Sequence, residues 1–392
     1  MTMKLLRNLK LAVGGILIAG LAACGGGGGD GGSAGTGTLR LAVTDAPACG
    51  YDAVNVTIQK VRVHQSISAS ETDPGWSELT LNPAVRLDLL GLTNGVLYEL
   101  GQLPLPTGKY TQMRLVLAAN GGAQPLANSV WPTGGKEVAL KTPSGQQSGV
   151  KANINIDIGP NQMADFVLDF DACKSIVSAG ASGQYLLKPV VSVIPRYTSG
   201  VLGYVDPALG SGVAGVSLQQ SDGTIVKATT PDANGKFLLQ PVAPGSYNLV
   251  MTAPGRTTAV VTGVPVTAQT VTPIASASAP MALPTSATAT ATGTAPVDTL
   301  VRAMQPLTIG GVVEVAGQYV DGVTGAYAFQ LPVAAPLVAA YAPAPAPLVF
   351  SPDNLVAARY TLRASLNGYA DKTEALPMLT AGGTKTTNFI FP

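Results

Sequence analysis

The chain carries few side chains of high reactivity. It has one histidine, His64, and three cysteines, Cys24, Cys49 and Cys173. A lone histidine does not make a zinc site without further ligands, and a Ser-His-Asp triad built on it would lack any nucleophile-elbow motif. The glycine runs do not lie between a strand and a helix, so a phosphate-binding loop is not indicated. We therefore predict no catalytic residue, a protein that is not an enzyme, and His64 on a strand near the surface.

The first 24 residues have the three parts of an export signal. Lys4, Arg7 and Lys10 form a basic start, residues 11–21 are an apolar run, and small residues precede Cys24. The apolar run is shorter than the roughly 20 residues that cross a bilayer as a helix. An export signal is therefore the favoured interpretation, and an N-terminal membrane helix is the alternative.

The tetrapeptide LAAC at 21–24 resembles the lipobox of bacterial lipoproteins, in which the cysteine is acylated and the signal is cut just before it. The resemblance implies a signal peptide over 1–23, an acyl anchor on Cys24 that makes the membrane a partner, and a glycine-rich tether over 24–37. Gly25, in place of Asp, resembles the outer-membrane sorting signal of Gram-negative lipoproteins. We expect an exported, lipid-anchored protein of the cell envelope, at the outer membrane.

Assigning Cys24 to the lipid leaves Cys49 and Cys173 as an even pair in an oxidising compartment. We expect a disulfide between them, and two buried free thiols are the alternative. The bond would bring the segments TDAPACGYD and LDFDACK within about 7 Å of each other, measured between the two cysteine Cα atoms.

Four aspartates flank those two cysteines: Asp45, Asp52, Asp169 and Asp171. The alternation of residues 166–170 turns the apolar side chains to the core, so Asp169 and Asp171 are expected on the outer face. Carboxylate oxygens are typical ligands of Ca²⁺, so the cluster is a candidate calcium site. No other cofactor is expected. The alternative is that solvent or neighbouring cations neutralise the cluster: Lys174, Lys60 and Arg62.

Composition favours an all-β protein. The 392 residues include 46 Gly and 30 Pro, which punctuate strands and turns and are poorly tolerated inside helices. Lys and Arg number 23 against 22 Asp and Glu. Such a balance argues against a nucleic-acid partner recognised by bulk charge.

Residues 38–197 show strand alternation with frequent turn signals. The apolar positions of VNVTIQKVRVHQ change parity after Ile58, which predicts a β-bulge near Gln59 and Lys60. No long helical period occurs. A β-sandwich stapled by the Cys49–Cys173 disulfide is expected over this range.

Two later blocks repeat one pattern, over 198–275 and 276–392. In each, a glycine turn leads into a strand, a Pro-rich connection follows, and the next strand begins Tyr-x-Leu at Tyr247 or Tyr360. The second copy carries an Ala/Pro-rich insertion over about 334–358, which we expect to be a surface loop. The stretch SASAPMALPTSATATATG between the copies is interpreted as a linker or weak edge strand.

The motifs of 38–197, including VTDAPACGYDAVNVTIQKVRVHQ and YLLKPVVSVIP, resemble an exported bacterial domain known as domain of unknown function 4382. The segment DANGKFLLQPVAPGSYNLVMTAPG resembles the carboxypeptidase regulatory-like domain, a transthyretin-like β-sandwich. The second repeat resembles it more loosely, because AARY replaces PGSY. The resemblance implies an all-β, multi-domain chain with two transthyretin-like or Ig-like units after the first sandwich, and a non-catalytic role.

We expect a non-enzymatic envelope lipoprotein for display, adhesion or ligand binding, with a glycan or an envelope protein as the partner. The first alternative is a carbohydrate-binding surface protein, and the second is an enzyme or an accessory to an envelope hydrolase. Carbohydrate binding would need exposed aromatic side chains, for which there are four candidates: Trp76, Trp131, Tyr341 and Tyr369. Core packing is the alternative fate of either tryptophan.

Overall fold

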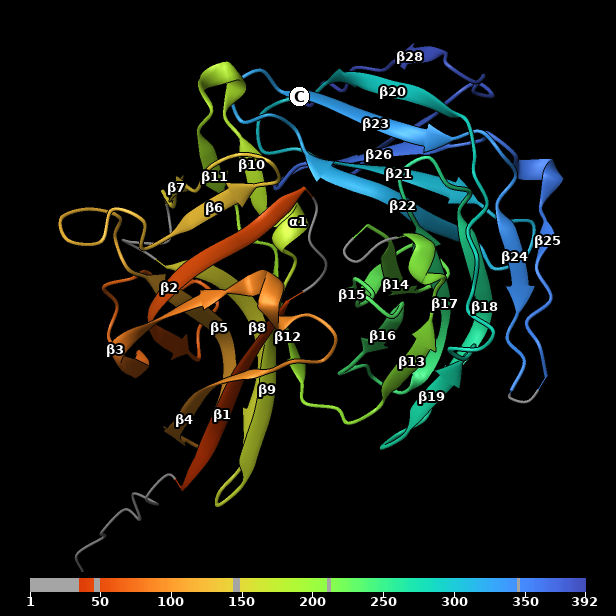
Figure 1. The fold of residues 1–392 in the computed structure, drawn as a ribbon. Coiled ribbons are helices and arrows are strands. Elements are labelled where there is room, and N and C mark those ends of the chain that lie inside the picture. The colour runs from red at the N-terminus through yellow and green to blue at the C-terminus, as the bar shows by residue number, and fades with distance from the viewer. Residues whose placement is uncertain (1–34, 46–49, 144–148, 210–212, 344–345) are drawn as a thin grey trace, which may run out of the picture. The chain divides into compact units, whose positions relative to one another are not determined.

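The computed structural model describes residues 35–45, 50–143, 149–209, 213–343 and 346–392. Within these ranges the chain is built almost wholly of strands, which confirms the all-β, multi-domain fold class. The helical elements are short, and the part of the chain described contains no helix long and apolar enough to cross a membrane. The strands fall into three groups, called the first, second and third domains below, coloured from red to blue in Figure 1.

The first domain is a pair of sheets around one apolar core. A four-stranded sheet has the order β12-β9-β1-β4, and the remaining strands form an eight-stranded sheet centred on β2. Side chains from both sheets, such as Leu41, Ile58 and Phe170, are fully buried between them. The elements are β1 (Thr36–Asp45), β2 (Tyr51–His64), β3 (Ser77–Asp88), η1 (Leu89–Leu92), β4 (Tyr98–Pro106), β5 (Gly108–Leu117), β6 (Ser129–Pro132), β7 (Val138–Lys141), β8 (Val150–Ile158), β9 (Met163–Phe170), α1 (Ala172–Ser175), β10 (Ile176–Ser178), η2 (Gly180–Ser182), β11 (Tyr185–Leu187) and β12 (Val191–Pro195).

Strand β2 contains the predicted bulge. Its register against both β3 and β5 shifts between Ile58 and Lys60. The extra residue lets Ile58 and Val61 both face the core, where neither is exposed. The parity change in the sequence therefore reported a real irregularity of the strand.

The second domain has a three-stranded sheet, β16-β13-β19, facing a larger sheet that begins β15-β14-β17-β18. Its core is formed by side chains of both sheets, among them Phe237, Leu239 and Leu249. The elements are β13 (Gly200–Tyr204), η3 (Pro207–Leu209), β14 (Gly215–Gln219), β15 (Ile225–Thr229), β16 (Lys236–Leu239), β17 (Gly245–Thr252), β18 (Ala259–Val266) and β19 (Val271–Ile274).

The third domain repeats this topology strand for strand. Its sheets β23-β20-β28 and β22-β21-β26-β27 have the same order and the same parallel and antiparallel pairings as their counterparts. Strand β20 is central in its sheet, so the stretch interpreted as a linker or edge strand contributes a core element. The elements are β20 (Thr288–Thr294), β21 (Leu300–Pro306), β22 (Val312–Tyr319), β23 (Ala326–Pro332), β26 (Thr361–Ser365), β27 (Lys372–Ala375) and β28 (Thr384–Thr386).

Equivalent local contacts recur in the two copies. Gly235 and Gly325 both adopt a positive φ, and each carbonyl accepts a hydrogen bond from the strand beside it, at Val205 N and Ala295 N. A side chain at either glycine would collide with that neighbouring backbone. The glycine turns that marked the repeats in the sequence are therefore required by the fold.

The insertion of the third domain is only partly a loop. It forms β24 (Leu337–Ala340), β25 (Ser351–Pro352) and the short η4 (Asn354–Val356), and β24 pairs in parallel with β18 of the second domain. Figure 1 shows these strands running beside β18, away from the sheets of their own domain. The third domain thus supplies two strands that complete the second domain's six-stranded sheet.

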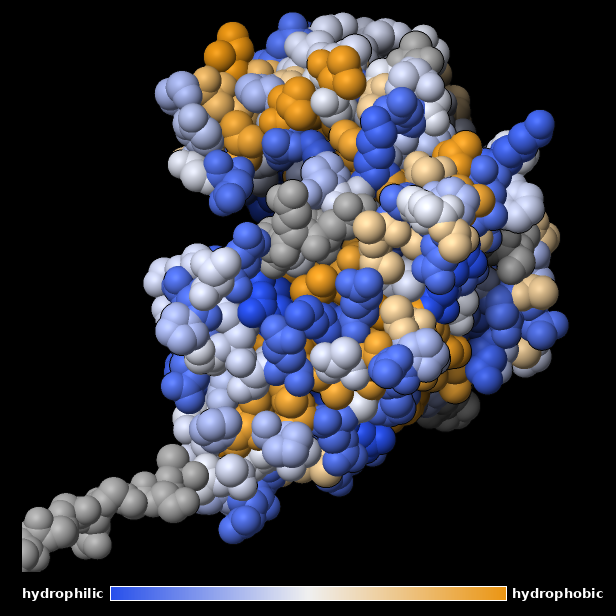
Figure 2. All heavy atoms as spheres, turned by 90° about the vertical axis from the view of Figure 1, so that its left-hand side faces the viewer, coloured by the Kyte–Doolittle hydropathy of each residue, from blue (hydrophilic) through white to orange (hydrophobic). Residues whose placement is uncertain are grey.

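The surface on the side of β3 and β7 has no single large apolar patch in view. Figure 2 shows hydrophobic residues scattered among hydrophilic ones over this face.

Candidate functional site

The first candidate site is the predicted aspartate cluster, which lies where β1 and β9 end side by side. The parallel register pairs Thr44 with Asp169 and Asp45 with Phe170. The face that carries Asp169 was expected to be the outer face of the domain. It is covered instead by β15 of the second domain, whose Lys227 places Nζ 2.6 Å from Asp169 Oδ1. The two side chains are only 1% and 10% exposed, so this is a buried ion pair between domains.

Asp171 belongs to a second ionic group. Its Oδ1 accepts a hydrogen bond from Lys174 N at 2.9 Å and thereby caps α1. Lys174 Nζ lies 3.6 Å from Asp171 Oδ2 and 2.8 Å from Oε1 of Glu314, a residue of β22 in the third domain. Burial opposes the charge of Lys174, but the two carboxylates outweigh it and raise the lysine pKa overall. Lys174 therefore joins the first domain to the third as an ammonium group.

Asp45 is the carboxylate without a cation of its own. Its side chain is buried, Oδ1 accepts a hydrogen bond from Ala172 N at 3.0 Å, and Oδ2 has no hydrogen-bond partner among the described residues. Burial raises the pKa of Asp45 well above its usual range, and the negative charges of Asp171 and Asp169 raise it further. Burial likewise raises the pKa of Asp169, against the lowering effect of Lys227.

The structure does not assemble the predicted calcium site. Asp52 stands apart, exposed on β2, where its Oδ1 accepts a hydrogen bond from Thr133 Oγ1. Among the described residues, no group of three or more His, Cys, Asp or Glu side chains is placed to hold a metal ion. Protein groups instead pair with Asp169, with Asp171 and with one oxygen of Asp45. Lys174 pairs with Asp171, as the alternative interpretation expected. Lys60 and Arg62 form ion pairs with Glu78 instead of with the aspartate cluster.

The cysteine predictions fall largely outside the described residues. Cys24 and Cys49 both lie there, so the acyl anchor and the partner in the predicted disulfide stay predictions. Cys173, in α1, is disulfide-bonded. It sits directly beside the ionic groups of Asp171 and Lys174.

His64 and Trp76 have structural roles. His64 Nδ1 accepts a hydrogen bond from Ser66 N, and Nε2 lies 3.0 Å from Pro74 O, so the proton is assigned to Nε2. The guanidinium carbons of Arg62 and Arg114 lie 4.7 Å and 5.1 Å from the centroid of the Trp76 ring. Trp76 thus makes cation–π contacts with two arginines of the same domain.

The other aromatic candidates do not form one platform. Trp131, on β6, is 43% exposed, and Tyr369, which follows β26, is 47% exposed. Tyr341, which follows β24, is half-buried against the second domain's core. These three residues belong to different parts of the fold, so they do not form one stacking surface for a carbohydrate.

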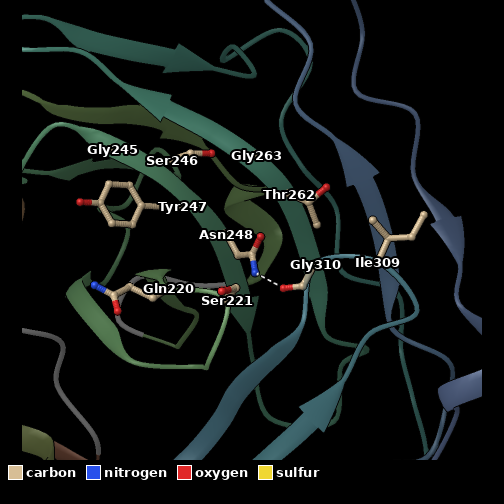
Figure 3. Close-up of a pocket in the computed structure, with 10 residues that line it drawn as sticks. All are labelled: Gln220, Ser221, Gly245, Ser246, Tyr247, Asn248, Thr262, Gly263, Ile309 and Gly310. Carbon is tan, nitrogen blue, oxygen red and sulfur yellow. Dashed lines mark hydrogen bonds between the residues drawn. The ribbon is translucent and has the colours of Figure 1, made fainter.

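A groove that the sequence did not reveal lies between the second and third domains. Figure 3 shows side chains of β17 and β18 facing the turn that joins β21 to β22. Asn248 Nδ2 donates to Gly310 O at 2.8 Å and ties the two sides together. The groove has a volume of about 640 Å³ and is lined only by uncharged residues: Gln220, Ser221, Gly245, Ser246, Tyr247, Asn248, Thr262, Gly263, Ile309 and Gly310. Sequence gave no signal for it, because its two sides come from segments far apart in the chain.

Fold and site define a tandem of β-domains in which the titratable clusters make contacts between domains. Residues 36–189 match the family described as domain of unknown function DUF4382. Residues 200–278 match the carboxypeptidase regulatory-like domain. The chain therefore contains these two domains in the order that its motifs predicted, and the second match covers the first of the two repeated units.

Solved structures give only distant likenesses. A type II cohesin–X-dockerin complex from Acetivibrio cellulolyticus is 23% identical over 22% of this chain and 58% of that one, with a TM-score of 0.20. The TIE protein of Bacillus anthracis is 12% identical over 91% and 50%, with a TM-score of 0.18. The pilus adhesin SpaC of Lactobacillus rhamnosus GG is 10% identical over 91% and 44%, with a TM-score of 0.15. Such scores carry no argument about function. No curated protein matches the chain.

Proposed function

We propose that this protein is a lipid-anchored, non-enzymatic display protein of the cell envelope, which presents its β-domains for adhesion or ligand binding. One observation carries the proposal: the three domains are joined through buried contacts. Lys227 pairs with Asp169, Lys174 pairs with Glu314, and β24 of the third domain extends a sheet of the second. Because the three domains are joined by these contacts, they can present a binding surface as one unit at a distance from the membrane anchor.

The anchor comes from the sequence. The lipobox-like LAAC supports acylation of Cys24, and a glycine-rich sequence lies between Cys24 and the first strand, which begins at Thr36. Two or more acyl chains on one cysteine give stable membrane attachment, which a single chain does not. Gly25 supports the outer membrane as the destination.

The reactive groups of the described residues support a non-enzymatic role. His64 is held by Ser66 and Pro74, and the buried carboxylates and lysines face one another across domain contacts. None of these groups lines the groove of Figure 3. Perturbed pKa values mark functional sites in many enzymes, but ion-pair networks between domains perturb them as well.

Protease treatment of intact cells tests display. A broad-specificity protease is expected to remove the protein from intact cells, while a periplasmic marker stays intact. Cys24→Ser, which removes the acylated thiol, is expected to move the protein from the membrane fraction to the soluble fraction. Digestion only after the outer membrane is permeabilised would contradict outward display, and membrane retention of Cys24→Ser would contradict the anchor.

A second candidate function is the binding of a neutral oligosaccharide in the groove. Its lining offers hydroxyl and amide groups and has no charged side chain. Pockets of a few hundred cubic ångströms with a few placed polar groups are typical of small-ligand sites. This observation favours a sugar over a charged ligand.

A glycan array tests this candidate. Ser246 is exposed on β17 within the groove, so Ser246→Arg fills the groove without disturbing the core. We expect at least one neutral glycan to bind the wild-type chain and Ser246→Arg to lose at least tenfold in affinity. The matched control, Ser278→Arg, changes an exposed serine that does not line the groove and should bind normally. Equal binding by both variants would remove the groove from consideration.

A further inference from the structure

Lys227 and Asp169 are an amine and a carboxyl group held in contact inside the protein. Nζ lies 2.6 Å from Oδ1, and the side chains are 1% and 10% exposed. A hydrogen bond of this length leaves the nitrogen roughly 3–3.5 Å from the carboxyl carbon, which is the separation of reacting atoms just before attack. The amine nitrogen is therefore close enough to the carboxyl carbon to attack it.

The surroundings favour the neutral form of the nearby carboxyl groups. Burial raises the pKa of Asp169 and, more strongly, that of Asp45. A low-dielectric site disfavours separated charges, so proton transfer from the ammonium to a carboxylate costs less there than in water. The exclusion of water also disfavours hydrolysis of any bond that forms by loss of water.

A third group is available to move protons. Asp45 interacts electrostatically with both Asp169 and Lys227. Its Oδ2 is buried and has no hydrogen-bond partner among the described residues, whereas its Oδ1 is fixed by Ala172 N. A buried carboxyl oxygen without a partner is costly, and a function in proton transfer accounts for it.

We propose that Lys227 and Asp169 condense into an isopeptide bond that joins the first and second domains covalently. The neutral Nζ attacks Asp169 Cγ, a nitrogen–carbon bond forms, and one carbon–oxygen bond of the carboxyl group breaks. The departing oxygen takes two protons that originate on the lysine ammonium and leaves as water. Asp45 accepts a proton from the nitrogen and returns it to the leaving oxygen. An ammonium and a carboxylate thus give an amide and one water, with no oxidant or reductant.

Lys174 and Glu314 form an internal comparison. This pair is also buried and spans two domains, with 2.8 Å between Nζ and Oε1. Lys174, however, is shared with Asp171, and its raised pKa holds it as an ammonium, which is not a nucleophile. We therefore assign condensation to the Lys227 pair and a lasting ion pair to Lys174.

Mass spectrometry of a tryptic digest of the reduced full chain tests the proposal. Condensation blocks cleavage at Lys227 and predicts one branched peptide joining residues 152–174 to 197–236, lighter by one water than its two parts. Cleavage at Lys174 should proceed normally and release residues 175–196. Complete cleavage at Lys227, with linear peptides of full mass, would overturn the proposal, as would loss of water located elsewhere.

Two variants distinguish an isopeptide bond between Lys227 and Asp169 from an ion pair between them. Lys227→Arg keeps a cation but has no condensing amine, and Asp45→Asn keeps the side-chain shape but carries no acid. Both are expected to give only linear peptides, while hydrogen exchange in β1 and β9 shows that the first domain is folded. A branched peptide from Lys227→Arg would overturn the assignment of the bond, and one from Asp45→Asn would overturn the role of Asp45. Neither outcome depends on where the protein is displayed.

Discussion

Replacing Lys227 with methionine is expected to lower the free energy of unfolding by at least about 3–5 kcal/mol. The lysine side chain is 1% exposed and Asp169 is 10% exposed, so the variant leaves a buried carboxylate without its cation. Asp171 adds negative charge close to Asp169. The loss of a buried partner, and of any covalent bond it makes, accounts for the size of the effect. Urea-induced unfolding of the full chain measures it.

The loss is expected to depend on pH. Burial already raises the pKa of Asp169, and Lys227 opposes that rise, so the variant raises the pKa further. A carboxyl group whose pKa is higher in the folded state binds more protons there than in the unfolded chain, and stability then falls as pH rises through that interval. The deficit of Lys227→Met should therefore be larger near about pH 8 than near about pH 5.

Two further variants show whether the loss of stability in Lys227→Met comes from the buried ion pair. Lys60→Met removes a lysine from a partly exposed pair with Glu78, with side chains 33% and 31% exposed. It should cost less than about 1 kcal/mol. The double variant Lys227→Met, Asp169→Leu replaces both charges with apolar groups and should recover the part of the loss that comes from the unpaired buried carboxylate. A loss in Lys227→Met no larger than that in Lys60→Met would show that the buried pair does not stabilise the junction.

Strand alternation predicted what lies within one element. The parity change near Gln59 correctly located the bulge, because alternation reports directly which side chains face a core. The same reasoning placed Asp169 on an outer face, which is correct for the first domain taken alone. Alternation does not say what covers that face, and Lys227, which does, lies in another domain. The sequence therefore led to the cluster and to Lys174 as the partner of Asp171, but not to Lys227 as the partner of Asp169.

The insertion in the third domain also could not be predicted from local sequence. Its Ala/Pro-rich composition is typical of loops, and β24 is only four residues long. It is a strand because β18 offers an unpaired edge, and that edge lies far away in the sequence. The groove of Figure 3 was missed for the same reason, since it exists only where the second and third domains meet. Non-local pairing, not local propensity, decides these features.

Deleting residues 335–355 is expected to destabilise the second domain rather than the third, which carries the insertion. Removal of β24 exposes the backbone edge of β18 at Ala259–Thr262. It also removes the apolar side chains that pack on the second domain's core: Leu337, Tyr341, Leu348 and Phe350. Each buried side chain of this kind contributes about 1–3 kcal/mol, and these are only partly buried, so the expected loss is on the order of 5 kcal/mol.

The third domain should keep its own core after the deletion. Ala358 and Tyr360 remain, and their backbone carbonyls accept the hydrogen bonds that align Leu379 and Leu376. In the second domain only the short segment 240–244 joins β16 to β17, so the same topology closes without an insertion. The deleted chain can therefore connect β23 to β26 directly.

Hydrogen exchange measured along the chain tests this assignment. Amide protection is expected to fall in β17 and β18 and to persist in β21 and β26. A point variant gives a milder version, since Phe350→Ala removes a ring packed on the second domain's core, while Val349→Ala alters a side chain that is 72% exposed and should have little effect. Loss of protection confined to the third domain would contradict the prediction. Val338 of β24 also packs against a small apolar cluster that includes Val250, Val260 and Val313. Loss of amide protection in the second domain would therefore show that the insertion stabilises the junction between the repeated units.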